Sequence, residues 1–341
     1  MRDLREKTGW RLCYLCDMKA MILALIIAAG APQDSLRLMF WNVENFFDWR
    51  NDSTSVSEAE FSSRGARRWT RKRFYSKADA IAKSILWTAA QEGGLPDAIG
   101  LAEVENAFVL RRLLQETALR KLDYRIVHFD SPDPRGIDVA LLYRSSRLEL
   151  VSAKACHLYA EDRSVLPTRD ILLAQFSHGG RLLSLLVNHH PSKFGGAAVS
   201  EPRRRQAVVR LKVLADSLVR AGPVVAMGDF NDTPEKPLYR QLAPTLRNLA
   251  EPLHQKGEGS IKYRGKWELI DMFFVSDACG PAEMKILRIP FLLVPDKAFA
   301  GDKPFRTYSG PRYIGGVSDH CPIWLNLQTS YNSANVQERY E

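Results

Sequence analysis

Two short polar clusters in this chain combine an acidic residue with a side chain that can contact a phosphate group. Asp229 follows the apolar run of residues 224–228, and Asn231 comes two residues later. Near the C-terminus, Asp319 and His320 lead directly into another apolar segment. A carboxylate and a carboxamide that a buried strand delivers into a turn can hold a hydrated metal ion and a phosphate oxygen. The two clusters are therefore predicted to belong to one active site.

Further polar residues recur where apolar segments end, and together they suit the hydrolysis of a phosphoester. That reaction needs positive charge near the non-bridging oxygens, a base for the attacking water and an acid for the departing oxygen. A set rich in carboxylates, with few nitrogen ligands and no thiolate, favours Mg²⁺, Mn²⁺ or Ca²⁺ over zinc. In chain order the candidates are Asn42, Glu44, Glu103, Asp138, His189, His190, Asp229, Asn231, Asp271, Asp319 and His320.

Several candidates also have a purely structural interpretation. Asp229 and Asn231 could form an Asx turn after a strand, and Glu103 could complement the dipole of the helix that follows it. Asp138 stands at the start of an apolar segment, where it could support a catalytic histidine or a turn. The functional interpretation is favoured for the set because the motifs occur together.

Two positions are constrained by their neighbours. His189 and His190 are adjacent in a predicted strand, so their side chains point to opposite faces and only one is expected to enter the site. Asp271 lies between Ile270 and Met272 in an apolar strand, where an unpaired carboxylate would be costly. A partner for Asp271 is therefore expected.

The elements that position these residues can be read from the periodicity of apolar residues. Alternating Leu36, Leu38 and Phe40 predict a first strand that ends at Asn42. Helices are expected over residues 76–91, 108–119 and 201–219, with Pro202 in the first turn of the last. Further strands are expected over residues 96–101, 124–129, 137–143, 148–156, 171–176 and 182–188, the last five as an antiparallel meander, and from residues 224, 269 and 323.

The pattern predicts a mixed α/β (α+β) fold in one domain, in which two sheets pack face to face with helices outside. Residues 1–31 are assigned to a signal peptide or upstream extension, 32–328 to the domain, and 329–341 to a polar tail. The hydrophobic content of 45% and charged content of 26% are typical of a soluble globular protein and exclude general disorder. The formal net charge of +9 favours a polyanionic substrate.

The N-terminal region has the anatomy of a signal peptide. Lys19 precedes the unbroken apolar run of residues 20–29, and small residues follow it. The run is too short to span a bilayer comfortably, so no stable membrane span is expected in the mature chain, which is predicted to be exported. Met18 could be the true start. Cys13 and Cys16 are interpreted as an accidental pair within this segment, and the remaining three cysteines allow at most one disulfide.

Six short motifs together resemble those of the DNase I-like endonuclease/exonuclease/phosphatase superfamily, in the same order along the chain. The resemblance covers nearly the whole predicted domain, from about Leu36 to Leu327. A single motif would be weak evidence, but chance agreement of six motifs in the same order is improbable. They lie at residues 41–45, 101–106, 188–192, 228–231, 269–271 and 318–320.

The resemblance implies a four-layer sandwich, in which two packed mixed β-sheets are flanked by helices, and it assigns roles to individual residues. Glu103 would be the main metal ligand, with Asn42 and Asp319 nearby. His320, supported by Asp271, would polarise the attacking water, and His189 would contact the scissile phosphate or protonate the leaving oxygen. Asp229 and Asn231 would orient the nucleophile and the phosphate, and His190 would occupy a place that an aromatic residue often fills.

The predicted function is that of an exported, divalent-metal-dependent phosphodiesterase, in first place a monomeric nuclease that cleaves DNA or RNA. Inositol phosphates, phosphoinositides and sphingomyelin remain alternative substrates, and a binding module without catalysis is a third possibility. The motifs do not decide among them, because substrate choice resides in loops. A basic run with interleaved rings, residues 64–75, could track phosphates and stack on bases, or could be a solvated face beside core aromatics.

Overall fold

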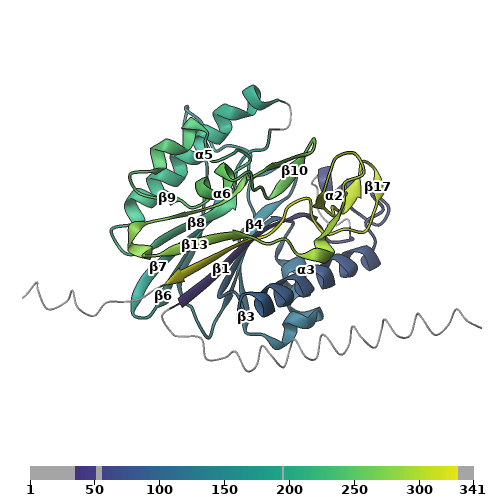
Figure 1. The fold of residues 1–341 in the computed structure, drawn as a ribbon, viewed down its shortest axis with the longest axis horizontal. Helices are drawn as coiled ribbons and strands as arrows, with labels where there is room; N and C mark the ends of the chain where they lie inside the picture. Colours follow the sequence, from purple (N-terminus) through teal and green to yellow (C-terminus); the bar gives the residue numbers. More distant parts are fainter. Residues whose placement is uncertain (1–34, 51–55, 194–195, 329–341) are drawn as a thin grey trace, which may run out of the picture.

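The computed structural model describes residues 35–50, 56–193 and 196–328 (Figure 1), so the predicted leader and the polar tail lie outside the described residues. Two sheets of six strands each form the centre of the molecule. The first sheet has the order β13 (Ala282–Ile286), β18 (Ile323–Gln328), β1 (Ser35–Phe46), β2 (Ala98–Val104), β4 (Asp138–Arg144) and β3 (Tyr124–His128). The second has the order β5 (Glu149–Cys156), β6 (Ile171–His178), β7 (Arg181–His189), β8 (Val224–Asp229), β12 (Asp271–Val275) and β9 (Arg247–Asn248).

Both sheets are mixed. Each contains one parallel pair, β1 with β2 and β7 with β8, and its other neighbouring strands run antiparallel. Parallel neighbours present the same ends at the same edge of a sheet, and the parallel pairs are therefore the places where two strands can deliver side chains to one point. This arrangement matters for the site described below.

Strand β1 shows why the two sheets pack together. Leu36, Leu38 and Phe40 belong to the core that the two sheets share, and Met39 and Trp41 belong to a second core beneath the helices. Successive side chains of a strand point to opposite faces, so one apolar strand can contribute to both cores. Both faces of the first sheet are covered in this way.

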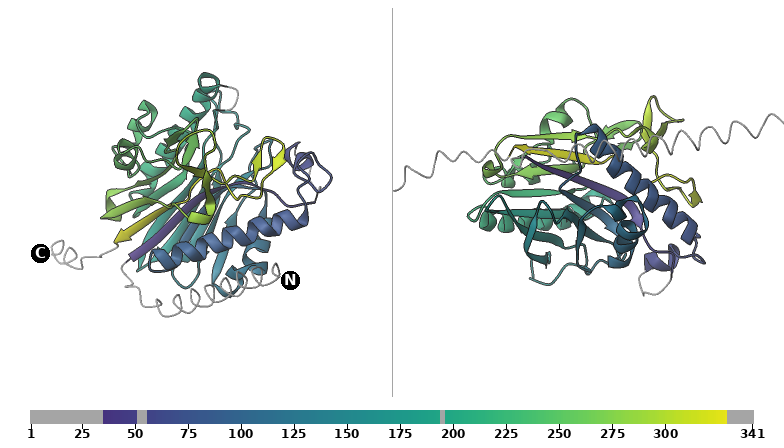
Figure 2. Two further views of the ribbon diagram at one scale, coloured as in Figure 1. Left: turned by 45° about the vertical axis from the view of Figure 1, so that its right-hand side comes forward. Right: turned by 90° about the horizontal axis from the view of Figure 1, so that it is seen from below.

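The helices form the outer layers. α3 (Arg71–Gln91) and α4 (Ala107–Glu116) contribute to the core on the outer face of the first sheet, and α5 (Ala197–Leu218) packs Ala207 and Leu211 against the second sheet. Figures 1 and 2 show α3 and α5 on opposite sides of the paired sheets. The four-layer sandwich predicted from the sequence is confirmed.

Shorter elements connect these layers. They are the helices α2 (Val56–Glu60) and α6 (Glu251–Gln255), the 3₁₀ turns η1 (Ala118–Lys121), η2 (Pro237–Leu242), η3 (Asp277–Cys279) and η4 (Pro290–Leu292), and the hairpin strands β10 (Ile261–Tyr263), β11 (Lys266–Glu268), β14 (Leu293–Pro295), β15 (Asp302–Pro304), β16 (Tyr308–Ser309) and β17 (Arg312–Tyr313). Within the described ranges, no helix is long and apolar enough to cross a membrane. Cys156, Cys279 and Cys321 are all buried and free.

Two local expectations need correction. The predicted meander is split, because β3 and β4 join the first sheet whereas β5, β6 and β7 form part of the second. The chain crosses between sheets after Arg144, where the buried Asp97 lies 3.0 Å from Nε of Arg147 and accepts a hydrogen bond from the backbone of Arg37. Helix α5 begins five residues before Pro202, so this proline lies inside the helix and not in its first turn.

Candidate active site

Six strand ends from both sheets meet at one edge of the sandwich. The parallel pairs bring Asn42 and Glu103 together in the first sheet and place His189 directly beside Asp229 in the second. The antiparallel strand β12 begins with Asp271 opposite Asp229. His320 lies three residues before Ile323, the first residue of β18. The topology therefore places these residues at the same edge although they are far apart in sequence.

A chain of short contacts joins the residues from the second sheet to His320. Nδ1 of His320 lies 2.7 Å from Oδ2 of Asp271, which supplies the partner that the sequence analysis expected for this carboxylate. Nε2 of His320 lies 3.8 Å from Oδ2 of Asp229. The same oxygen lies 3.6 Å from Nε2 of His189, so Asp229 stands between the two imidazoles.

Asn42 connects the two sheets. Its Nδ2 donates to Oδ2 of Asp229 at 3.0 Å and to Oε1 of Glu103 at 3.4 Å. Its Oδ1 accepts a hydrogen bond from the backbone N–H of Glu44 at 2.9 Å. Asn42 therefore orients two carboxylates in this arrangement, and its predicted role as a metal ligand stays a prediction.

The remaining predicted residues fall into two groups. Asn231 and Asp319 belong to the site: the backbone N–H of Asn231 donates to Oδ1 of Asp229 at 2.9 Å, and Oδ1 of Asp319 lies 3.9 Å from Nε2 of His320. Asp138 has a different set of partners, Ser131 and His128, whose Nε2 is 3.3 Å from its Oδ2. Asp138 lies outside the cluster formed by the other residues.

The two adjacent histidines differ in the way the sequence analysis anticipated. His189 faces Asp229, whereas the ring of His190 packs edge-on against Phe230, with 4.7 Å between ring centroids. Neither ring nitrogen of His190 has a hydrogen-bond partner among the described residues. Burial, followed by the charges of Arg169 and Arg204, lowers the pKa of His190 to about 3. His190 thus behaves as a neutral aromatic side chain.

Several site residues have a backbone conformation that is rare outside glycine. In the described part of the chain, Glu44, Asn45, Glu103 and Asn231 have φ angles of 50°, 51°, 61° and 52°. A non-glycine residue in this left-handed region is uncommon, and such strain clusters at functional sites. Hydrogen bonds support it here, since the backbone N–H of Asn45 donates to Oε2 of Glu103 at 2.8 Å.

The surroundings of Asp229 and His320 raise the pKa of both side chains. Burial raises the pKa of Asp229 to about 7, and the charge of Asp271 adds to this effect while His320 opposes it. Burial alone would lower the pKa of His320, but the charges of Asp271, Asp229 and Asp319 raise it well above its ordinary value. Both groups therefore bind a proton more readily than they would in water.

His189 has the opposite tendency. Burial lowers the pKa of His189 well below its ordinary value, and the charges of Arg169 and Arg135 lower it further. A neutral imidazole results, and it has one N–H available to donate to a phosphate oxygen. The two histidines are therefore electrostatically distinct.

The donor set fits a hard divalent cation. The side chains of Glu103 and Asp319 are 14% and 38% exposed, so both carboxylates can be reached from solvent, and the buried Asp229 lies behind them. The excess of carboxylate oxygens and the absence of thiolates are typical of magnesium, manganese or calcium sites. Glu103 and Asp319, two of the three residues predicted as metal ligands, could hold such an ion. Asp229, Asp271 and His320 also lie close enough together to bind one, but the hydrogen bond between Asp271 and His320 is better suited to moving protons.

Three cationic side chains near the site were not identified from the sequence. Arg135 lies 3.9 Å from Oε2 of Glu103, Arg306 lies 3.0 Å from Oδ2 of Asp319, and the buried Lys77 donates to the backbone carbonyl of Glu44. Glu44 is held on the other side by the backbone N–H of Thr307, which donates to its Oε2 at 2.7 Å. No spacing signal marks these cations among the 48 Lys and Arg residues of the chain.

The stacking interpretation of the basic run is wrong for two of its three rings. Trp69 and Phe74 are fully buried, and Nε1 of Trp69 donates to the carbonyl oxygen of Phe47 at 2.7 Å. Arg73 lies over the ring of Tyr313, with its Cζ 4.1 Å from the ring centroid. Because these aromatic side chains complete the core beneath α3, they cannot stack on nucleic-acid bases.

Fold and site together define a DNase I-like hydrolase of phosphoester bonds. The chain belongs to the endonuclease/exonuclease/phosphatase family, whose sequence profile matches residues 37–329. The family and the acidic and histidine groups of the site support a metal-dependent reaction. Among curated proteins, none gives a significant sequence match.

Solved structures share the fold at low sequence identity. The human Nocturnin catalytic domain with bound sulfate anion is 18% identical, with a TM-score of 0.55 over 86% of this chain and 94% of that chain. A family member from Bacteroides thetaiotaomicron is 16% identical, with a TM-score of 0.53 over 86% and 97% of the two chains. D. rerio TDP2 complexed with a single-stranded DNA product is 17% identical, with a TM-score of 0.51 over 86% and 98%.

Proposed function

We propose that the protein is an exported, divalent-metal-dependent phosphodiesterase that hydrolyses DNA or RNA. The observation that carries the proposal is the contact sequence from Asp271 through His320 to Asp229, beside Asn42 and Glu103. It combines a hydrogen-bonded imidazole, a buried carboxylate and an oxygen-rich cation site in one place. Direct attack by water on a phosphodiester needs these three components.

Each side chain of the site would have its own role in the reaction. Asp271 accepts a hydrogen bond from Nδ1 of His320, which fixes the orientation and tautomer of the ring and leaves Nε2 toward Asp229 and the reacting water. His189 donates a hydrogen bond to a phosphate oxygen. Asn231, fixed to Asp229 and to the carbonyl oxygen of His190, would hold another oxygen. The divalent ion, when bound, would neutralise charge that develops on the phosphate.

Nucleic acid is favoured as substrate by charge and by one structural relative. The net charge of +9 favours association with polyanions, and Arg135 and Arg306 are exposed beside the carboxylates of the site. One relative of the same fold is known with a single-stranded DNA product. Both observations support an extended polyanion more than a small phosphate ester.

The decisive experiment is a matrix of metals and substrates. Purified protein is incubated with Mg²⁺, Mn²⁺, Ca²⁺ or EDTA, and with single-stranded DNA, duplex DNA, RNA, an inositol polyphosphate and sphingomyelin vesicles. We expect cleavage of a nucleic acid that requires metal and is absent in His320→Ala. Cleavage restricted to the inositol or lipid substrates would replace the nuclease proposal, and metal binding without any hydrolysis would favour a non-catalytic binding module.

Export and the monomeric state are proposed on separate grounds. Export is supported by the apolar run of residues 20–29, which lies outside the described residues. Expression of the full-length gene, fractionation and N-terminal sequencing of the product would locate the mature start; an intact N-terminus on protein retained in the cytoplasm would contradict export. Light scattering of the purified protein tests the monomer.

A further inference from the structure

The cation Arg306 lies between two carboxylates on the metal side of the site. Its Nη2 is 3.0 Å from Oδ2 of Asp319, and its Nε and Nη2 are each 3.5 Å from Oε1 of Glu44. The side chain is 51% exposed, so the bridge is open to solvent on one side. One guanidinium thus contacts a carboxylate from the first strand and another from the segment before the last strand.

The carboxylate of Glu44 is fixed in this position from behind. The backbone N–H of Thr307 donates to its Oε2, and Lys77 holds the backbone by donating to the carbonyl oxygen of Glu44 and, at 2.8 Å, to Oγ1 of Thr307. Because Thr307 follows Arg306 in the chain, the same tether that fixes Glu44 also fixes the backbone of the arginine. The bridge is therefore part of a built structure and not a chance encounter of surface charges.

Hydrolases that use two metal ions hold them about 3.5–4 Å apart, and carboxylates are the usual protein ligands of such hard divalent ions. Here a guanidinium occupies the space between Glu44 and Asp319. It carries one positive charge, remains protonated at all relevant pH values, and its planar fork matches carboxylate oxygens. A covalently tethered cation in this place repels a second divalent ion and engages the oxygens that would bind it.

We infer that Arg306 replaces a second metal ion, and that the site therefore binds a single divalent ion, held by Glu103 and Asp319. This inference rests on the metal dependence in the proposed function but not on the identity of the substrate. It predicts that removal of the guanidinium exposes a second cation site formed by Glu44 and Asp319.

Calorimetric titration of the full-length protein with Mn²⁺ tests the inference without any measurement of activity. We expect one ion per wild-type molecule at this site. Arg306→Met should bind a second Mn²⁺, because the positive charge that lies between the carboxylates of Glu44 and Asp319 has been removed. Arg306→Lys, which keeps the charge, should remain close to wild type.

Two further variants make the result specific. Arg306→Met combined with Glu44→Gln should lose the additional binding, because the second carboxylate is gone. Arg240→Met removes an exposed arginine in η2 and should titrate as wild type. Circular dichroism and thermal unfolding verify that each variant is folded.

The outcomes separate the inference from the proposed function. Two ions bound by the wild-type protein, or an unchanged stoichiometry in Arg306→Met, would overturn the role of Arg306 and leave the metal-dependent hydrolase intact. A wild-type protein that binds no Mn²⁺ would overturn both.

Discussion

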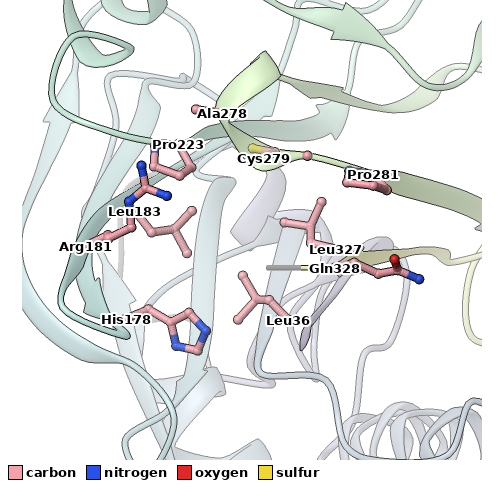
Figure 3. Close-up of a pocket in the computed structure, with 11 residues that line it drawn as sticks. Leu36, His178, Arg181, Leu183, Pro223, Ala278, Cys279, Pro281, Leu327 and Gln328 are labelled. Carbon is pink, nitrogen blue, oxygen red and sulfur yellow. The ribbon is translucent and has the colours of Figure 1, made fainter. Parts of the chain in front are cut away.

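The two ends of the sandwich are built from the same strands, but they differ in the residue types that have a positive φ angle. Strands β1, β7 and β18 have one end at the active site and the other at a cavity of about 80 Å³, where Leu36, Leu183 and Leu327 meet His178 and Arg181 (Figure 3). Positive φ angles occur at both ends of the molecule. Around the cavity they belong to Gly179, Gly180 and Gly280, whereas at the site four of them belong to non-glycine residues that carry functional groups.

This difference shows where the function of a side chain outweighs the steric cost of a strained backbone. Glycine adopts a positive φ without steric cost, but each non-glycine residue in this region costs on the order of 1–3 kcal/mol. At the site, Glu44, Asn45, Glu103 and Asn231 accept that cost. Their side chains or their backbone N–H groups make contacts that glycine could not replace in full. The comparison leads to four predictions.

The largest effect is expected when the imidazole–carboxylate pair is broken. His320→Ala and Asp271→Asn should each lower kcat by about 10²–10⁴-fold, the usual contribution of a positioned acid or base. His178→Ala, at the opposite end of the same sandwich, should leave kcat unchanged and serves as the control. Steady-state kinetics with an oligonucleotide measure kcat for all three variants. Equal losses of kcat in His178→Ala and in the two site variants would contradict the assignment of catalysis to one end of the sandwich.

A second variant separates backbone strain from chemistry at one position. Glu103→Gly should relieve the positive φ and remove a charge from a crowded acidic cluster, but it also removes the acceptor for the backbone N–H of Asn45. The opposing effects should keep the change in the free energy of unfolding in EDTA to about 1 kcal/mol or less. Metal affinity should nevertheless fall, and kcat/KM should drop by about 10²-fold or more, because the ion supplies several kcal/mol of charge stabilisation. A much larger loss of stability in urea denaturation, with metal affinity unchanged, would show that the role of Glu103 is structural.

The pH dependence of stability should differ with and without metal. The raised pKa values of Asp229 and Glu44, both about 7, mean that the folded state keeps protons the unfolded state has lost, so stability falls as these groups ionise. The raised pKa of His320 contributes stability that is present below its ordinary value of 6.5 and is lost as pH rises through its folded value. His189 and His190, with lowered pKa values, act in the acidic range, where they reduce stability as pH falls below 6.5.

In EDTA we therefore expect the Tm to decrease between pH 6.5 and 8. Added Mn²⁺ binds the ionised carboxylates of the folded state, so the rise in Tm that it causes should grow over the same interval. Differential scanning calorimetry at several pH values measures both. A Tm in EDTA that increases toward pH 8 would mean that the pKa values of these carboxylates are not raised in the folded state.

The smallest effect is expected at His190. His190→Phe should change the free energy of unfolding by about 1 kcal/mol or less, because the ring is neutral, packs against Phe230 and has no hydrogen-bond partner among the described residues. His189→Phe, the matched change one residue earlier, should abolish most activity. Comparable activity losses in the two variants would show that both histidines face the substrate.

The residues that the sequence identified share one property: each stands within a few residues of the end of an apolar strand. Asp271 is an example, since a carboxylate inside a run of buried residues requires a partner, and the structure supplies His320. Arg135 and Arg306 lie in loops, where no periodicity distinguishes a functional arginine from a solvated one. Strand pairing is equally non-local, and the apparent meander therefore concealed the crossing between the sheets.

The bond between Nε1 of Trp41 and the carbonyl oxygen of His320, 2.9 Å long, has a consequence for truncated forms of the chain. It joins the first strand to the segment before the last, as does the hydrogen bond from Ser318 to the carbonyl oxygen of Asn42. A polypeptide that lacks residues 318–320 makes neither hydrogen bond and has no imidazole at this position, so it cannot assemble the site.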